Sequence, residues 1–335
     1  MNLPAAAGPG ILDWTGRGLA ALPAPPPAGT RELWLDDNLF AAIPESVRPL
    51  RALEQLHLDR NALRALPDWL GELGGLRTLS LYGNDLAELP RAIGALARLE
   101  HLSAGRNALA SVPETLWRLT GLRTLILSEN RLATFGDGVG ALAGLEVLDL
   151  GHNQLASLPA GTAELQRLEV LYLSDNRLAA LPPPVAALRR LTYLGATDNA
   201  LVSLPEDLGA LTALVELRLD RNSLASLPES LGALSALREL HLAHNRLEHV
   251  PDGIAGLRGL RKLSLRANLL AAVPDALADL AALRELDLRS NRLRDLPASL
   301  GRLQRLEKLD LRWNKLRALP PEVRRLEERG CVVLG

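Results

Sequence analysis

Hydrophobic and polar residues follow one short pattern that recurs along this chain every 23 residues. Each copy has the form LxxLxLxxNxLxxLPxxLxxL, so that leucines alternate with variable residues just before an asparagine. Proline follows six residues after the asparagine in twelve of the thirteen copies, and Gly136 is the exception. The spacing has no insertion or deletion across the thirteen asparagines, which are Asn38, Asn61, Asn84, Asn107, Asn130, Asn153, Asn176, Asn199, Asn222, Asn245, Asn268, Asn291 and Asn314.

Each part of the pattern predicts a local structure. The LxL segment has a period of two, which is typical of a short strand with its leucines pointing inward. The inward asparagine amide has two donor hydrogens and one acceptor oxygen, so it can pair with backbone groups of its own coil and of the next. Proline prevents a second strand, and the LxxL spacing after it suits a helical or 3₁₀ turn. One coil cannot bury its leucines alone, and we therefore expect a stack of coils.

These residues resemble the leucine-rich repeat superfamily. The LP step after the asparagine and the G-x-L of Gly94, Ala95 and Leu96 are similar to the 23-residue intracellular class, which includes Ras-group and cell-polarity scaffolds and many bacterial proteins. The resemblance implies an α/β fold, a leucine-rich repeat solenoid curved as a horseshoe. It also implies a parallel sheet on the concave face, short helices or 3₁₀ turns on the convex face, and protein binding on the concave side, often in signal transduction.

The ends of the chain depart from the repeat. Residues 1–29 are expected to form an N-terminal cap with a degenerate repeat, and residues 30–328 the thirteen repeats, the last of which merges into a charged cap helix closed by Gly330. Residues 329–335 are expected to form a C-terminal cap strand, with Val332 and Leu334 continuing the inward alternation.

Composition narrows the functional classes. No apolar run approaches the ~18 residues that cross a bilayer, so no membrane insertion is expected. The net charge of −1 gives no general attraction to nucleic acid. Cys331 is the single cysteine, which excludes a disulfide framework or a cysteine-rich zinc site. The first ten residues lack the charged and apolar regions of a secretion signal, and the prediction is a cytoplasmic protein.

Aromatic residues gather at predicted outward positions of the strands, which lie six, four, two and one residues before each asparagine. All three tyrosines are there, together with two of the five tryptophans. The leucines already fill the core, so exposed aromatics favour a binding surface, with packing between neighbouring strands as the alternative. Small residues between the tyrosines predict a shallow trough with aromatic shoulders. The predicted protein-binding aromatic and apolar residues are Tyr82, Ile126, Tyr172, Tyr193 and Trp34.

Charge is distributed unevenly. Residues 1–254 hold 21 basic and 29 acidic residues, whereas residues 255–335 hold 17 basic and 10 acidic ones. Arg266, Arg289 and Arg312 stand two residues before successive asparagines, and we include them in the predicted binding face because an arginine column can receive acidic or phosphorylated groups. Asp287 and Asp310 lie two residues away, so neutralisation within the sheet is the alternative.

No catalytic, cofactor or metal site is predicted. His101 and Ser103 share a strand, but Asp149 lies two strands further, about 10 Å away, which is too far to orient a catalytic histidine. The function predicted from the sequence is therefore a non-enzymatic scaffold that binds an unidentified partner protein, with a monomer slightly favoured. The alternative is a bacterial effector, exported without a cleaved signal, that binds a host protein through the same face.

Overall fold

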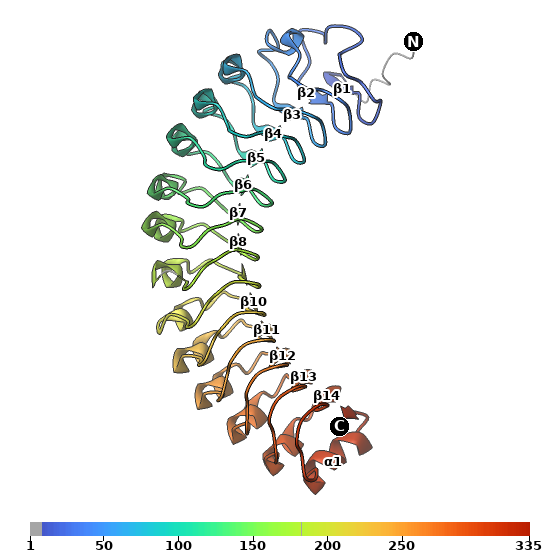
Figure 1. Ribbon diagram of the computed structural model, residues 1–335, viewed down its shortest axis with the longest axis vertical. Helices are drawn as coiled ribbons and strands as arrows, with labels where there is room; N and C mark the ends of the chain where they lie inside the picture. The colour runs from blue at the N-terminus through green and yellow to red at the C-terminus, as the bar shows by residue number, and fades with distance from the viewer. Residues whose placement is uncertain (1–8, 182) are drawn as a thin grey trace. The chain divides into compact units, whose positions relative to one another are not determined.

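The computed structural model describes residues 9–181 and 183–335. The chain forms two compact units, residues 1–155 and residues 156–335, and each is described by itself. Both units are stacks of coils in which one short strand and one short helix alternate. Within each unit the strands line one side and the helices the other (Figure 1). No helix among the described residues is long and apolar enough to span a membrane.

The first unit contains seven three-residue strands and five 3₁₀ helices among its described residues. The strands are β1 (Ile11–Asp13), β2 (Glu32–Trp34), β3 (Gln55–His57), β4 (Thr78–Ser80), β5 (His101–Ser103), β6 (Thr124–Ile126) and β7 (Val147–Asp149). The 3₁₀ helices are η1 (Glu45–Val47), η2 (Asp68–Glu72), η3 (Arg91–Ala95), η4 (Glu114–Arg118) and η5 (Asp137–Ala141).

The second unit repeats this architecture and ends in an α-helix. Its strands are β8 (Val170–Tyr172), β9 (Tyr193–Gly195), β10 (Glu216–Arg218), β11 (Glu239–His241), β12 (Lys262–Ser264), β13 (Glu285–Asp287), β14 (Lys308–Asp310) and β15 (Val332–Leu334). Its helices are η6 (Ala160–Glu164), η7 (Pro183–Ala187), η8 (Leu208–Ala210), η9 (Glu229–Ala233), η10 (Asp252–Gly256), η11 (Asp275–Asp279), η12 (Ala298–Arg302) and α1 (Pro321–Glu328).

The sheet of each unit is parallel, and every strand pairs with the next one along the chain. The register follows the sequence repeat, since Leu56 of β3 is the partner of Leu79 of β4 and the same central leucine recurs on the strands that follow. These leucines are fully buried. The predicted fold class, a leucine-rich repeat solenoid, is confirmed.

Each repeat asparagine joins two coils through its side chain. Asn268 is 4% exposed, and its Nδ2 donates to the carbonyl oxygens of Leu265 in its own coil (3.0 Å) and Leu242 in the preceding coil (2.9 Å). Its Oδ1 accepts the backbone N–H of Leu247, also in the preceding coil, at 3.0 Å. The sequence analysis placed this bridge toward the next coil, and that direction is wrong. The turn before the asparagine directs its side chain toward the preceding coil.

The residue just before each of these asparagines has a left-handed backbone. Twelve such residues are not glycine, with φ between 49° at Arg106 and 58° at Trp313, and Gly83 occupies the thirteenth position with φ 69°. This conformation costs a side-chain-bearing residue about 1 kcal/mol. The hydrogen bonds of the asparagine that follows offset this cost in every coil.

The last strand has a different register from the one predicted. β15 pairs with β14 at an offset of 24 residues, so that Val333 is the partner of Leu309 and Val332 that of Lys308. Val332 is therefore on the outward side and is 54% exposed. The prediction that Val332 and Leu334 point inward is wrong, because the chain that passes through α1 is one residue longer than a repeat.

The coil in which Gly136 replaces the proline also differs from the others in its packing. Trp117 packs edge-on against Phe135, with ring centroids 5.2 Å apart. The other coils have a smaller leucine, isoleucine or valine at the position of Phe135, just before the proline. A Cβ at Gly138 would lie 2.1 Å from Trp117 Cδ1, so the indole requires a glycine there. Gly136 keeps the backbone of the prolines it replaces, with φ −71° and ψ 151° against −68° and 152° at Pro90.

We expect Asn268→Ala to lower the free energy of unfolding by about 2–3 kcal/mol, because buried donors and acceptors in two coils lose their partner. Urea titration followed by circular dichroism measures the change. Arg246→Ala, at an exposed position of the preceding coil, is the control and should leave the midpoint unchanged. Equal midpoints for the two variants would show that water replaces the amide at no cost.

We expect Gly136→Pro to raise the free energy of unfolding by about 0.5–1 kcal/mol, since proline restricts the unfolded chain and fits the native φ. The N–H that is lost donates no hydrogen bond to the described residues, and an added Cβ would make only ordinary contacts of 3.5 Å. Gly138→Ala should do the opposite and cost about 1–3 kcal/mol through overpacking against Trp117. Thermal melts of both variants test the pair, and stabilisation by Gly138→Ala would contradict this description of the site.

Candidate functional site

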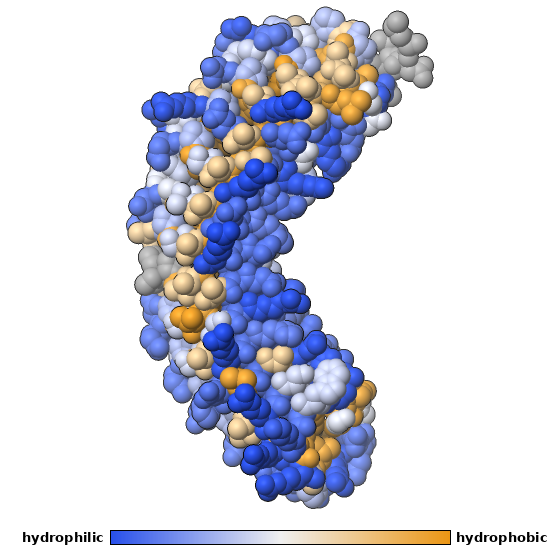
Figure 2. Space-filling model, viewed as in Figure 1, coloured by the Kyte–Doolittle hydropathy of each residue, from blue (hydrophilic) through white to orange (hydrophobic). Residues whose placement is uncertain are grey.

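The outward side chains of the strands form the surface on which the sequence analysis placed a binding site. We call this surface the strand face of each unit. Its residues lie in columns, because parallel pairing at a constant offset puts equivalent repeat positions side by side. The strand side of each unit is mostly hydrophilic, and the hydrophobic residues that show gather in narrow bands beside it (Figure 2).

In the first unit, Tyr82 is engaged within the sheet. Its ring lies over Gly105, where an added Cβ would be 3.0 Å from Tyr82 Cδ2, and its hydroxyl donates to Glu129 at 2.8 Å. This hydrogen bond is the main reason why the pKa of Tyr82 is raised. Ile126 is half-buried on β6. The expected trough is thus partly filled here, because the aromatic ring folds over a glycine that was predicted to leave the floor open.

A second aromatic contact of the first unit joins β2 and β3. Trp34 stacks on His57 with ring centroids 3.8 Å apart and an interplanar angle of 7°. Trp34 Nε1 donates to Glu32 at 3.4 Å, and burial lowers the pKa of His57. Packing between neighbouring strands therefore accounts for the position of Trp34.

In the second unit, Tyr172 and Tyr193 come together on β8 and β9. Their ring centroids are 4.8 Å apart at an angle of 45°. The ring of Tyr193 lies over Gly195, where an added Cβ would be 2.9 Å from Tyr193 Cε1. Tyr172 stays 38% exposed. The pair is a small aromatic surface that is partly open to solvent.

The predicted arginine column is largely neutralised by its own sheet. Arg289 binds Asp287 at 2.5 Å and Asp310 at 3.3 Å, while Arg312 binds Asp310 at 2.7 Å. Burial raises the pKa of Asp310, but the hydrogen bonds from Arg312 and the charge of Arg289 outweigh it and hold the pKa below its usual value. Arg266 has no ion pair among the described residues, and its buried Nε has no hydrogen-bond partner there. An anionic partner would have to displace carboxylates from two of the three arginines.

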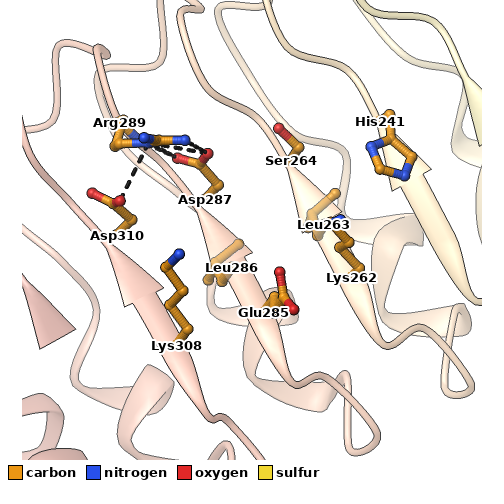
Figure 3. A pocket seen from close by; sticks show the side chains of 10 residues that line it. All are labelled: His241, Lys262, Leu263, Ser264, Glu285, Leu286, Asp287, Arg289, Lys308 and Asp310. Atoms are coloured by element: carbon orange, nitrogen blue, oxygen red, sulfur yellow. Dashed lines mark hydrogen bonds and ion pairs between the residues drawn. The ribbon is translucent and has the colours of Figure 1, made fainter. Parts of the chain in front are cut away.

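A hollow of about 230 Å³ opens on the strand face beside these ion pairs (Figure 3). Leucines of β12 and β13 form its floor, and charged residues of the successive strands β12, β13 and β14 form its walls. Lys262, Glu285 and Lys308 lie along one side, with the Arg289–Asp287 pair and Asp310 along another. The hollow is small and mixed in charge, so it is suited to one polar side chain of a partner.

The sequence analysis missed one group of residues. Glu216 of β10 lies beside Glu239 and His241 of β11, and one ligand atom from each residue lies within 4.8 Å of the other two. The signal was present, because Glu216 and Glu239 are one repeat apart and His241 is on the same side of its strand as Glu239. The sequence analysis considered His101 and Ser103 with Asp149, two strands further, but not Glu216 with Glu239 on neighbouring strands.

Asp36, in the first unit, is a carboxylate whose pKa is raised. Its Oδ1 accepts the backbone N–H of Asp59 at 2.6 Å, in the column two residues before each asparagine. Burial raises the pKa of Asp36 to about 6, and the nearby charge of Asp59 raises it further than Arg60 lowers it. The native state therefore binds a proton on Asp36 more tightly than the unfolded chain does, so its contribution to stability improves as the pH falls from above 6 toward 4.

We expect Asp36→Asn to stabilise the protein at pH 7 by about 1 kcal/mol, since the amide keeps the acceptor oxygen but has no charge to bury. The advantage over the parent chain should shrink as the pH is lowered from 7 to 5, where Asp36 becomes protonated. Thermal midpoints of both proteins across this range measure the difference. An advantage that stays constant with pH would show that Asp36 is already neutral or well solvated.

Comparison with known proteins supports the same architecture. A leucine rich repeat family model matches residues 143–201, 212–270 and 258–316. Comparison with curated protein sequences finds no match. An internalin of Listeria monocytogenes has 23% identity, with 88% of this chain and 83% of that one covered and a TM-score of 0.77, which shows the fold alone.

Two solved structures are more similar in sequence. The plant peptide hormone receptor RGFR1, solved in complex with RGF2, has 28% identity over 92% of this chain and a TM-score of 0.79, and the match covers 52% of that receptor. A leucine-rich repeat protein of Leptospira interrogans has 30% identity and a TM-score of 0.86, with 98% of this chain and 96% of that one covered. With the repeat, the asparagine ladder and this similarity together, the chain belongs to the leucine-rich repeat family, whose fold serves generally as a protein-interaction module.

Proposed function

We propose that this protein is a non-enzymatic scaffold that binds an extended segment of a partner protein on the strand face of its second unit. The observation that carries the proposal is the Tyr172–Tyr193 pair, which leaves one ring 38% exposed at a position where the core gains nothing from it. Partly exposed tyrosines on a rigid sheet are typical anchors, because a partner orders them at little cost in entropy.

The shape of the strand face favours an extended segment. Each strand has three residues, so the face is narrow along the strands. Across the strands from β8 to β14 it runs for about 30 Å at the usual spacing of parallel strands. A segment lying across the strands would pass from the tyrosine pair to the hollow between β11 and β14. The peptide complex of the similar plant receptor supports this kind of partner.

The charges along this path limit what the segment can carry. Arg218 pairs with Glu216, and Arg289 and Arg312 pair with aspartates, so few cations stay without an ion pair. Lys262 and Lys308 form no ion pair among the described residues and line the hollow. We propose that the segment places an apolar or aromatic side chain on the tyrosines and a polar side chain in the hollow.

The double variant Tyr172→Ala with Tyr193→Ala should weaken partner binding at least tenfold, since a true anchor contributes about 2 kcal/mol or more. Affinity purification with the parent chain identifies the partner, and calorimetry with the purified partner then measures Kd for each variant. The matched control is Arg189→Ala with Arg190→Ala, two exposed residues on the opposite side of the coils, which should leave Kd unchanged.

The outcome separates two surfaces. Loss of binding in the tyrosine variant alone, with the fold intact by circular dichroism, supports the strand face of the second unit. Loss of binding in the arginine variant alone would place the partner on the helical side and overturn the proposal.

A further inference from the structure

The group of Glu216, Glu239 and His241, which we call the Glu-Glu-His cluster, has features that protein binding does not explain. Glu216 on β10 is the direct register partner of Glu239 on β11, and His241 follows two residues after Glu239 on the same side of the strand. Side chains of register partners in neighbouring strands stand about 5 Å apart, so the two carboxylates are held side by side by the backbone itself.

Glu216 and Glu239 are two like charges side by side in the column six residues before each asparagine, and this differs from the strands that follow. From Glu239 onward the residues six before each asparagine alternate in sign, as Glu239, Lys262, Glu285 and Lys308. Directly opposed like charges on neighbouring strands destabilise a sheet, and only the pair of Glu216 and Glu239 breaks the alternation in these described strands. Arg218 already pairs with Glu216 and offsets part of this repulsion, whereas a metal ion bound to both carboxylates would turn it into attraction.

The histidine supplies a third donor atom of the correct type. The His241 side chain is 11% exposed, and its Nε2 lies 3.0 Å from Glu239 Oε2. Packing therefore fixes the ring, whereas Glu239, 40% exposed, and Glu216, 24% exposed, keep freedom to adjust. A buried imidazole with two more mobile carboxylates is a donor set that suits zinc and its neighbours in the first transition series.

The distances are close to those of a metal site. Two ligand atoms each about 2.1 Å from a tetrahedral ion lie roughly 3.4 Å from one another. The histidine–carboxylate distance of 3.0 Å already matches, and the three donor atoms lie within 4.8 Å of one another. Glu216 is 24% exposed, so its side chain has room to turn toward the other two donors once it leaves Arg218.

We propose that Glu216, Glu239 and His241 form a binding site for a divalent transition-metal ion of the zinc type. The ion is held by His241 Nε2 and one oxygen from each glutamate, and a fourth position stays open to water. Arg218 competes with it, because its guanidinium is hydrogen-bonded to Glu216 Oε1 and has to release this carboxylate when the ion binds.

The competition with Arg218 gives the proposal its sharpest test. Calorimetric titration of the untagged, metal-free full chain with zinc chloride should show one saturable site. Arg218→Gln should tighten binding, since it frees Glu216 without removing a ligand. Glu239→Gln and His241→Asn should each weaken binding at least tenfold, which is the scale of loss when metal sites are perturbed.

Matched controls separate the site from general binding to surface acids and histidines. Glu285→Gln removes a carboxylate from the same column, and His101→Ala removes an exposed strand histidine, so both should bind zinc like the parent chain. Zinc should also raise the thermal midpoint of the parent chain and of Glu285→Gln, but not that of Glu239→Gln. This second readout keeps the test valid if His241→Asn fails to fold.

Two results would overturn the proposal. One is the absence of saturable zinc binding by the parent chain. The other is binding that survives in both Glu239→Gln and His241→Asn, because the ion would then lie elsewhere on the molecule.

Discussion

The hydrogen bonds of the repeat asparagines are the interaction on which the rest of this structure depends. Each amide ties a turn to the coil before it, as Asn268 does through Leu242 and Leu247. Leucines alone would fill the core but tolerate slippage between coils, because one leucine replaces another at little cost. A buried amide that must find two particular carbonyls and one N–H does not tolerate it. The asparagines thus set the register, and the register decides which side chains point outward.

The same bonds explain a backbone feature that residue types do not reveal. The position before each asparagine has positive φ, yet it holds eight residue types in different coils: aspartate, arginine, histidine, glutamate, serine, alanine, tryptophan and glycine. Glycine or asparagine would be expected if local preference decided the conformation. Here the neighbouring amide imposes it, and the side chain is left free to vary. A sequence pattern based on turn-forming residues therefore does not identify the position before each asparagine as left-handed.

Sequence reasoning predicted the architecture well, because the fold depends on a pattern that every coil repeats. It failed where a single coil differs. Val332 and Leu334 were placed inward because the repeat length was carried into a cap whose strand pairs at 24 residues, and only the pairing with β14 reveals the extra residue. The expected trough is partly filled for a related reason, since the direction in which Tyr82 leans over Gly105 depends on its rotamer and its neighbours, not on the periodicity.

In the candidate site, too, the repeat predicts which residues are outward but not how their side chains pack. That Tyr172 and Tyr193 are outward follows from the register, but their contact at 4.8 Å depends on how two side chains share the space above Gly195. The neutralised arginines were predictable as an alternative, because Asp287 stands two residues from Arg289 on one strand. The Glu-Glu-His cluster needed a comparison of residues one repeat apart, which in a parallel stack means neighbours in space.

Stability and recognition are therefore carried by different atoms of the same coil. The inward leucines and the asparagine amide hold neighbouring coils together in every repeat, whereas outward side chains such as Asp36 do so only in single coils. Tyr193 is the register partner of Glu216, so the tyrosine pair and the Glu-Glu-His cluster are neighbours across β8 to β11 of the second unit. Because the ladder fixes the backbone beneath both, a change in one outward side chain alters the surface without altering the register. An outward column can in this way hold an aromatic residue on one strand and carboxylates on the next two, as Tyr193, Glu216 and Glu239 do, while the core sequence stays the same.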